Sequence, residues 1–170
     1  MVAIRTSGGI LPMRMVYADL PENPFQGVSF IHESTGLPIF HDGTAWACDL
    51  PGVRLYAQPG GLTARKLVTL VAGVPTLTDP TTHNRCDGMV RAAGIARTGG
   101  AGELVAITAD GEVSGFAGLN PGDSLFAGED GDVTTDPDDA WYIIPIGWAL
   151  TAARVLVRVP PAGTVMDPPG

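Results

Sequence analysis

The chain has 170 residues, of which 23 are glycine and 15 are proline, and its formal net charge is −8. Hydrophobic residues make up 45% of the chain and charged residues only 16%, so it is too apolar to be disordered throughout. Glycine shows no three-residue period, which excludes a collagen helix. The frequent glycines and prolines also argue against a helix bundle. A strand-rich globular protein with many loops remains.

The acidic charge is unevenly spread along the chain. There is one lysine, Lys66, and no basic residue occurs between Arg97 and Arg154. Phosphate backbones are bound through Lys and Arg, so nucleic acid is not expected as a partner. One face of the C-terminal half is expected to be strongly negative.

Two cysteines, Cys48 and Cys86, are too few for a disulfide scaffold; two buried free thiols are expected, with a single bridge as the alternative. The longest charge-free apolar stretch, residues 143–153, is too short to span a bilayer. Gly8, Gly9 and Pro12 interrupt any signal-peptide core. We therefore expect a soluble protein made in a cytoplasm, with no membrane partner.

In chain order, residues 1–26 are irregular because Pro12, Pro21 and Pro24 prevent a long helix. Their apolar residues have no clear local partner. The segment is therefore predicted either to pack along its own domain or to reach a neighbour as an extended N-terminal arm. The residues of this arm that we expect to contact a partner are Ile10, Leu11, Met13, Met15 and Tyr17.

Residues 27–60 are predicted to form a β-hairpin segment and a linker with one short strand. Apolar runs at 28–31 and 37–41 are separated by a turn, and Asp42-Gly43 predicts a type I′ hairpin turn before a returning strand at 44–48. His32, His41 and Cys48 also lie here. Their spacing matches no zinc-binding pattern, so packing roles are expected, with a metal site as the alternative.

Residues 61–160 are predicted to form the main domain, followed by a loose tail at 161–170. Beta-branched residues at 65–72 favour a strand. Two further strands, at 104–108 and 124–127, each run into an Asp-Gly pair, which predicts two successive hairpins. The remaining segments are an apolar run at 89–96, a turn at 119–123, and closing strands at 141–150 and 155–159.

These elements predict an all-β fold, a small β-barrel or β-tulip-like domain of short hairpins with an extended N-terminal arm. No nucleotide-binding loop or G-x-S-x-G motif occurs, and no pair of carboxylates stands out. We therefore expect neither an enzyme nor a cofactor.

Two groups of residues leave alternatives open. The acidic loop at 128–139 does not match a calcium-loop pattern and is expected to be a solvated turn. The alternative is a cation held by Asp136, Asp138 and Asp139 at a subunit junction. Tryptophans in hairpins and closing strands are expected in the core, with a sugar-binding platform as the alternative; they are Trp46, Trp141 and Trp148.

Two stretches resemble structural proteins of tailed-phage particles. Residues 30–46 resemble a virion hairpin motif that ends in (W/N/D)-G-T-A-W, here Asp42-Gly43-Thr44-Ala45-Trp46. The second half is similar to the capsid cement, or head decoration, proteins of tailed bacteriophages. The segments that carry this likeness are LVTLVAGVP at 67–75, Ala-Gly-Ile-Ala at 93–96, Ala-Gly-Glu-Leu-Val at 101–105, Leu-x-Pro-Gly-Asp at 119–123 and Ile-Gly-x-Ala-Leu-x-Ala at 146–152.

The resemblance implies a small β-barrel or β-tulip subunit, often trimeric, without catalytic residues. It implies a virion structural protein on the capsid surface, synthesised in the host cytoplasm. Its expected partners are the major capsid protein lattice and further copies of itself in a homotrimer. The alternative is a tail- or fibre-associated adhesin that binds a host surface glycan through its tryptophans.

Overall fold

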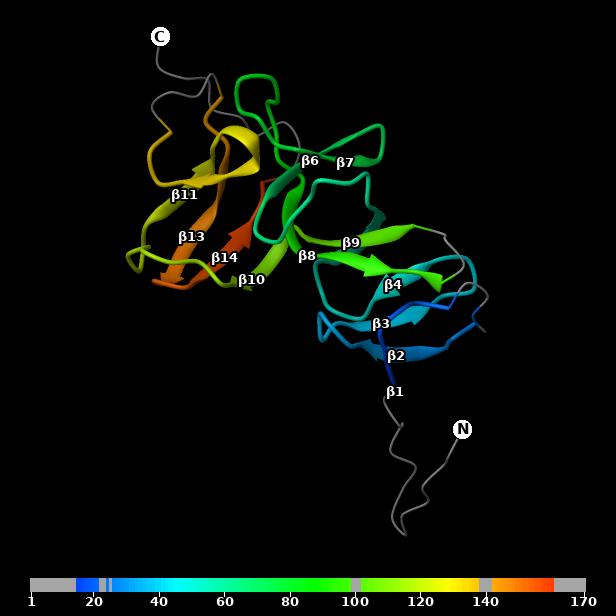
Figure 1. Ribbon diagram of the computed structural model, residues 1–170. Coiled ribbons are helices and arrows are strands. Elements are labelled where there is room, and N and C mark those ends of the chain that lie inside the picture. Colours follow the sequence, from blue (N-terminus) through cyan, green and yellow to red (C-terminus); the bar gives the residue numbers. More distant parts are fainter. Residues whose placement is uncertain (1–14, 22–23, 25, 99–101, 138–141, 161–170) are drawn as a thin grey trace.

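The computed structural model describes residues 15–21, 24, 26–98, 102–137 and 142–160. This part of the chain is built from β-strands and contains no α-helix, so the predicted all-β class is confirmed. Its strands form three sheets, with the N-terminal sheet at one end of the molecule and the C-terminal sheet at the other (Figure 1). No helix long and apolar enough to cross a membrane occurs among the described residues.

The N-terminal sheet has the order β1-β2-β3-β4. Its first strand, β1, is parallel to β2, and the other neighbours are antiparallel. The strands predicted around 28–31, 37–41 and 44–48 are confirmed as β2, β3 and β4. The bounds are β1 (Met15–Tyr17), β2 (Ser29–His32), β3 (Pro38–His41) and β4 (Trp46–Cys48).

The turn between β3 and β4 differs from the predicted type I′ turn. Positive φ occurs at Gly43 (109°) but not at Asp42. The Asp42 carboxylate instead accepts hydrogen bonds from the Thr44 and Ala45 N–H groups and from the Thr44 hydroxyl, each at 2.8 Å. The predicted hairpin is present, but a side-chain-capped Asx turn forms it.

The middle sheet has the order β5-β9-β8-β6-β7 and connects the other two. The strands predicted at 65–72, 89–96 and 104–108 are confirmed as β6, β8 and β9. A type I′-like turn does occur here, at Ala72 (φ 50°) and Gly73 (φ 81°) between β6 and β7. The bounds are β5 (Val53–Ala57), β6 (Leu67–Val71), β7 (Val74–Leu77), β8 (Gly88–Ala96) and β9 (Glu103–Thr108).

The C-terminal sheet has the order β10-β14-β13-β11-β12. The hairpin predicted at Asp110-Gly111 is wrong, because β9 pairs with β5 and β8 whereas β10 pairs with β14. The chain crosses there from the middle sheet to the C-terminal sheet. The second Asp-Gly pair, at 130–131, does lie between paired strands. The bounds are β10 (Asp110–Ser114), β11 (Ser124–Ala127), β12 (Val133–Thr134), β13 (Pro145–Thr151) and β14 (Arg154–Arg158).

Buried side chains of the middle sheet pack against both the N-terminal sheet and the C-terminal sheet. Along β9, Leu104 and Ala106 join a cluster with the N-terminal sheet. Val105 and Ile107, which point to the opposite face, join a second cluster. Leu67 and Met89 of the middle sheet pack into the core of the C-terminal sheet. The middle sheet thus contributes side chains to all three hydrophobic clusters.

The second cluster draws residues from all five strands of the middle sheet, and its edge strands β5 and β7 approach each other. The sheet is therefore strongly curved. Among the described residues, none of the three sheets closes on itself through backbone pairing.

Candidate functional site

The predicted arm is only partly within the described residues. Ile10, Leu11 and Met13 lie outside them. Met15 and Tyr17 lie in β1, where their backbones pair with Phe30 and His32 of the same chain. The C-terminal part of the segment therefore enters the fold as the terminal strand of the N-terminal sheet.

Leu20 fixes the chain immediately after β1. Its N–H donates to the Ala96 carbonyl (2.9 Å), and its own carbonyl accepts from the N–H of Thr98 (2.9 Å). The side chain is 0% exposed and lies in the core between the N-terminal and middle sheets. Sequence reasoning missed this anchor, because a single leucine among prolines carries no periodic signal.

The N-terminal sheet is apolar on both faces. Phe30 and Ile39 are buried in the core cluster shared with the middle sheet, and His32 is buried on the same face of β2. The alternate positions form what we call the outer face, and none of them belongs to a buried core cluster of the described residues. The outer face consists of Val16, Ser29, Ile31, Pro38, Phe40 and Ala47.

The outer-face residues are neighbours across the strands. Ile31 pairs with Val16 on one side and with Pro38 on the other, while Phe40 pairs with Ser29 and Ala47. Val16 is 58% exposed, the largest value among the exposed large hydrophobic residues of the described chain. Alternation alone does not reveal this patch, because both faces of the strands are apolar.

Trp46 lines a hollow of about 320 Å³ between the N-terminal and middle sheets, together with His41 and Arg97. Its ring lies 5.3 Å from that of Phe30 and 5.1 Å from that of His41, measured between centroids. It also packs on the core between these sheets, as the core interpretation predicts. One edge of the ring therefore remains available to this hollow.

The other two tryptophans differ from Trp46. Trp141 lies outside the described residues. Trp148 is 38% exposed on β13, with Ser124 and Leu156 beside it on the neighbouring strands. The structure does not bring Trp46 and Trp148 together, because they lie in sheets at opposite ends of the molecule.

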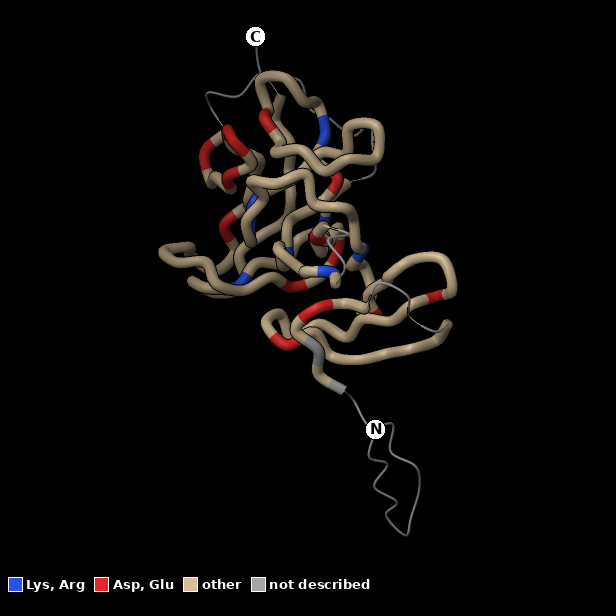
Figure 2. The backbone as a smooth tube through the Cα atoms, turned by 45° about the vertical axis from the view of Figure 1, so that its right-hand side comes forward, with Lys and Arg blue, Asp and Glu red and all other residues tan. Residues whose placement is uncertain are grey.

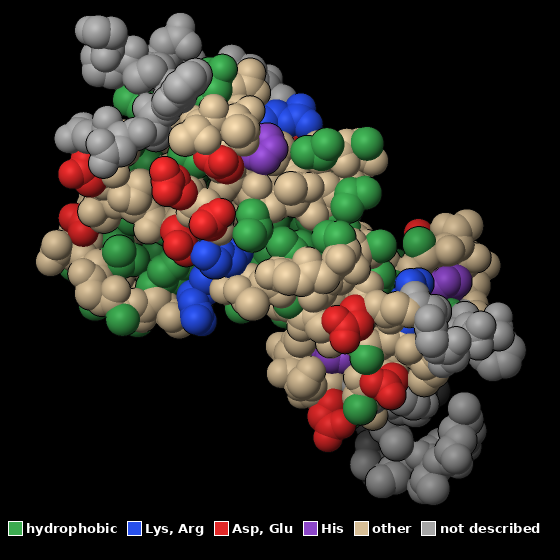
Figure 3. Space-filling model, turned by 45° about the horizontal axis from the view of Figure 1, so that its top comes forward, with side chains coloured by type: hydrophobic (Ala, Val, Ile, Leu, Met, Phe, Trp, Pro, Cys, Tyr) green, Lys and Arg blue, Asp and Glu red, His purple; other side chains and the backbone are tan. Residues whose placement is uncertain are grey.

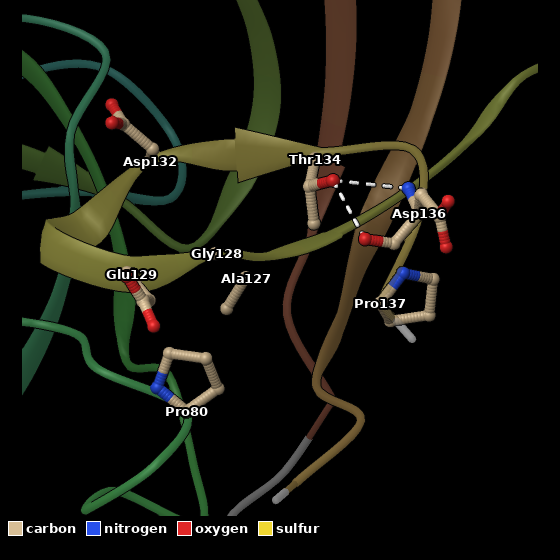
Figure 4. Close-up of a pocket in the computed structure, with 8 residues that line it drawn as sticks. All are labelled: Pro80, Ala127, Gly128, Glu129, Asp132, Thr134, Asp136 and Pro137. Carbon is tan, nitrogen blue, oxygen red and sulfur yellow. Dashed lines mark hydrogen bonds between the residues drawn. The ribbon is translucent and has the colours of Figure 1, made fainter. Parts of the chain in front are cut away.

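The acidic loop borders a hollow of about 350 Å³ near Pro80 (Figure 4). Glu129, Asp132 and Asp136 are among the residues that line it, and the Thr134 hydroxyl donates to the Asp136 carbonyl at 2.8 Å. Lys66 binds this loop through the Asp132 carboxylate (2.7 Å) and the Asp130 carbonyl (3.1 Å). The single lysine thereby neutralises part of the acidic loop.

No cluster of three His, Cys, Asp or Glu side chains suited to a metal ion occurs among the described residues. The proposed cation ligands Asp138 and Asp139 lie outside them. His32 is buried and hydrogen-bonded through Nδ1 to Thr35 Oγ1 at 2.9 Å. The structure therefore does not bring His32, His41 and Cys48 together as a metal site.

Both thiols are free, as predicted, but only Cys86 is buried and Cys48 is partly exposed. Burial raises the pKa of the Cys86 thiol to about 11, and it also raises the pKa of the half-buried Cys48. Because the thiolate is the reactive form, neither cysteine is suited to act as a nucleophile.

Charge is segregated between the sheets. Six of the ten Lys and Arg residues lie at 54–97, in the strands of the middle sheet and in the loops between them, whereas residues 15–53 contain five Asp and Glu and no Lys or Arg. Figure 2 shows the N-terminal sheet without a basic residue. Several of the cations face the C-terminal sheet: Lys66 pairs with Asp132, and Arg91 donates to the Glu112 carbonyl at 2.8 Å. The N-terminal sheet keeps its acidic charge.

The chain was compared with models of protein families, with curated proteins and with solved structures, and it matches none of them.

Proposed function

We propose that the protein is a bacteriophage virion structural protein that decorates and stabilises the assembled capsid. It acts as a cement or head decoration protein, or as the base of a head fibre, by protein–protein binding. A subunit that binds the assembled shell but not free capsid protein stabilises the shell by mass action. No catalytic step and no cofactor belong to this proposal.

The observation that supports the proposal most is that the C-terminal part of the arm pairs with β2 at the edge of the N-terminal sheet. It joins the N-terminal sheet as β1, an edge strand that carries the exposed Val16. A short exposed edge preceded by an apolar segment is suited to binding by strand addition or by packing on a neighbour. The residues proposed to contact the capsid are Ile10, Leu11, Met13, Met15 and Tyr17.

A second observation supports the resemblance to cement proteins. The Leu-x-Pro-Gly-Asp turn and the Ile-Gly-x-Ala-Leu motif, far apart in sequence, are hydrogen-bonded to each other. Gly122 N–H donates to the Ala149 carbonyl at 2.8 Å, and Ala149 N–H donates to the Asp123 carbonyl at 2.9 Å. The two motifs thus form one structural unit beside β11 and β13.

The finer fold and the assembly are also part of the proposal. The curved middle sheet, whose edges approach each other, is consistent with a partly open β-barrel or tulip. We propose that the subunit forms homotrimers on the virion surface after synthesis in the host cytoplasm. Light scattering that showed a monomer at high concentration would count against the trimer.

The test of the proposal is a deletion of the arm. Removing residues 1–26 would also remove β1 and the buried Leu20. A loss of capsid binding could then result from damage to the hydrophobic core instead of from loss of the arm. Removing residues 1–14 leaves β1 and Leu20 in place. We expect this shorter variant to keep the thermal unfolding midpoint of the full chain and to lose co-sedimentation with capsids assembled without the protein. Unchanged co-sedimentation would refute the role of the arm.

The alternative, a tail- or fibre-associated adhesin, draws its support from the exposed Trp148. An exposed aromatic ring offers a flat apolar face on which a sugar ring could stack. A glycan array probed with the full chain and with Trp148→Ala separates the two functions. Sugar binding that the substitution abolishes would favour the adhesin over the cement protein.

A further inference from the structure

We propose that the outer face of the N-terminal sheet lies against the capsid, and that the capsid site it fits has an apolar centre surrounded by Lys and Arg. This inference rests on the proposed function and extends its contact surface from the arm to a folded sheet. It also sets the orientation of the subunit, with the N-terminal sheet inward and the C-terminal sheet toward solvent.

The first argument is the composition of the outer face. An antiparallel sheet that has one face in water normally alternates apolar and polar residues. Here five of the six outer-face positions are apolar, and the register makes them contiguous, with Ile31 and Phe40 at the centre. Of these apolar residues Val16 is exposed, and the other four are partly buried. A contiguous apolar patch that reaches solvent is typical of a protein-binding surface.

The second argument is the charge around the patch. The exposed carboxylates Glu33, Asp42 and Asp49 follow the ends of β2, β3 and β4, and no Lys or Arg occurs at 15–53. Figure 3 shows several acidic side chains and a basic group on this lobe, at the lower right. Hydrogen bonds from the backbone of Ala45 and Thr44 lower the pKa of Asp42 to about 2, so this rim charge persists. A partner of opposite charge is complementary.

The third argument is continuity with the arm. In β1, Val16 shares the outer face with Ile31, whereas Met15 and Tyr17 occupy the register positions beside Phe30 and His32 on the other face. Of the strand residues in the arm, Val16 is therefore the one that belongs to the outer face. The outer face belongs to the N-terminal sheet, which lies at one end of the molecule (Figure 1). The C-terminal sheet, which carries the acidic loop, lies at the other end. A second copy of this chain would bring acidic rims together and is a poorer fit for the outer face.

The orientation can be tested by protection of single introduced thiols. Ser29→Cys lies on the outer face and Ser124→Cys on β11 of the C-terminal sheet; both serines are exposed strand residues. Free and capsid-bound chains are treated with a maleimide, and the parent chain gives the background from Cys48 and Cys86. We expect capsid binding to slow labelling at position 29 about tenfold or more and to leave labelling at position 124 unchanged.

Equal labelling at position 29 in the free and bound chains would overturn the inference and leave the proposed function standing. Failure of the parent chain to co-sediment with capsids would instead refute the function, and the inference with it. Protection at position 124 alone would show the opposite orientation.

Matched substitutions test the chemistry of the partner. Val16→Ser on the outer face is compared with Val74→Ser on β7, since these valines are 58% and 47% exposed and both lie in edge strands. Glu33→Lys is compared with Glu129→Lys in the acidic loop. We expect the first member of each pair to weaken capsid binding about tenfold and the second to leave it unchanged.

Added salt should also weaken binding, because it screens exposed charges. Binding that strengthens with Glu33→Lys would overturn the basic character of the capsid site. If Val16→Ser changed the oligomeric state and not capsid binding, the outer face would be a contact between copies and the inference would be wrong.

Discussion

Replacing Leu20 with alanine tests whether the segment after β1 is part of the core. The side chain is 0% exposed and lies between the N-terminal and middle sheets. The substitution removes three carbon atoms, at about 0.8 kcal/mol for each buried group, and leaves a cavity that adds to the loss. We expect the free energy of unfolding to fall by about 3 kcal/mol, a large fraction of the roughly 5–15 kcal/mol of a typical domain.

The assay is thermal unfolding followed by circular dichroism, with urea unfolding as a second measurement. For a chain of this size about 3 kcal/mol corresponds to a fall of roughly 6–12 °C in the unfolding midpoint. The backbone hydrogen bonds of residue 20 remain in the variant, so the measurement isolates the side chain. Val16→Ala, in the exposed part of β1, is the control and should change stability by less than about 0.5 kcal/mol. A Leu20→Ala midpoint within about 2 °C of the parent would refute the anchor.

Three further predictions concern other sites. Hydrogen bonds lower the pKa of Asp42 from 3.8 to about 2, so the stability that the ionised carboxylate contributes should be present above about pH 4 and be lost as the pH falls toward 2. The thermal unfolding midpoints of the parent and of Asp42→Asn should therefore converge between about pH 4 and pH 2. A thiol reagent at pH 8 should leave Cys86 unmodified until the chain is unfolded, and rapid modification of both thiols in the native protein would contradict its burial. Ala72 has a φ of 50° in its turn, so Ala72→Asn should raise the free energy of unfolding by about 0.5–1 kcal/mol in urea titrations; a lower value would show that the turn is held differently.

Local features of the fold follow well from the sequence. Asp42-Gly43 predicts a hairpin, and the hairpin is there, because the geometry of a short turn depends on the residues within it. The runs that form β6, β8 and β9 are recognisable for the same reason, since β-branched residues bounded by glycine and proline favour strands.

Pairing between distant strands does not follow from local pattern. Asp110-Gly111 has the same residues as a hairpin turn, yet β10 pairs with β14, which lies more than forty residues later in the chain. At a third Asp-Gly pair, a Cβ on Gly88 would lie 2.6 Å from Ile107 Cγ2. Glycine there permits close packing on β9 rather than a turn. The same dipeptide thus has different roles that only the tertiary contacts distinguish.

The candidate site was only partly predictable for a related reason. The apolar residues of the arm stand out in the sequence and lead to the proposal that it binds a partner. The outer face does not stand out, because Ile31 and Phe40 belong to strands that are apolar on both faces. A strand that is apolar on both faces predicts burial of both faces but does not identify the element or partner that covers each one. Leu20 was missed because its partners, Ala96 and Thr98, are far away in the sequence.

The distribution of charge links the fold to the proposed contact. The middle sheet supplies cations to the C-terminal sheet, through Lys66 to Asp132 and through Arg91 to the Glu112 carbonyl. Arg154 adds a second contact to Glu112, at 3.2 Å from its carboxylate. Exposed pairs of this kind contribute only about 0–1 kcal/mol each, so they reduce repulsion within the acidic sheet more than they hold the fold together. The N-terminal sheet has no Lys or Arg among residues 15–53, and exposed carboxylates follow the ends of the strands that carry the outer face. We therefore expect a binding partner to supply the positive charge opposite these carboxylates. Comparing the capsid affinity of Glu33→Lys with that of Glu129→Lys measures this electrostatic contribution.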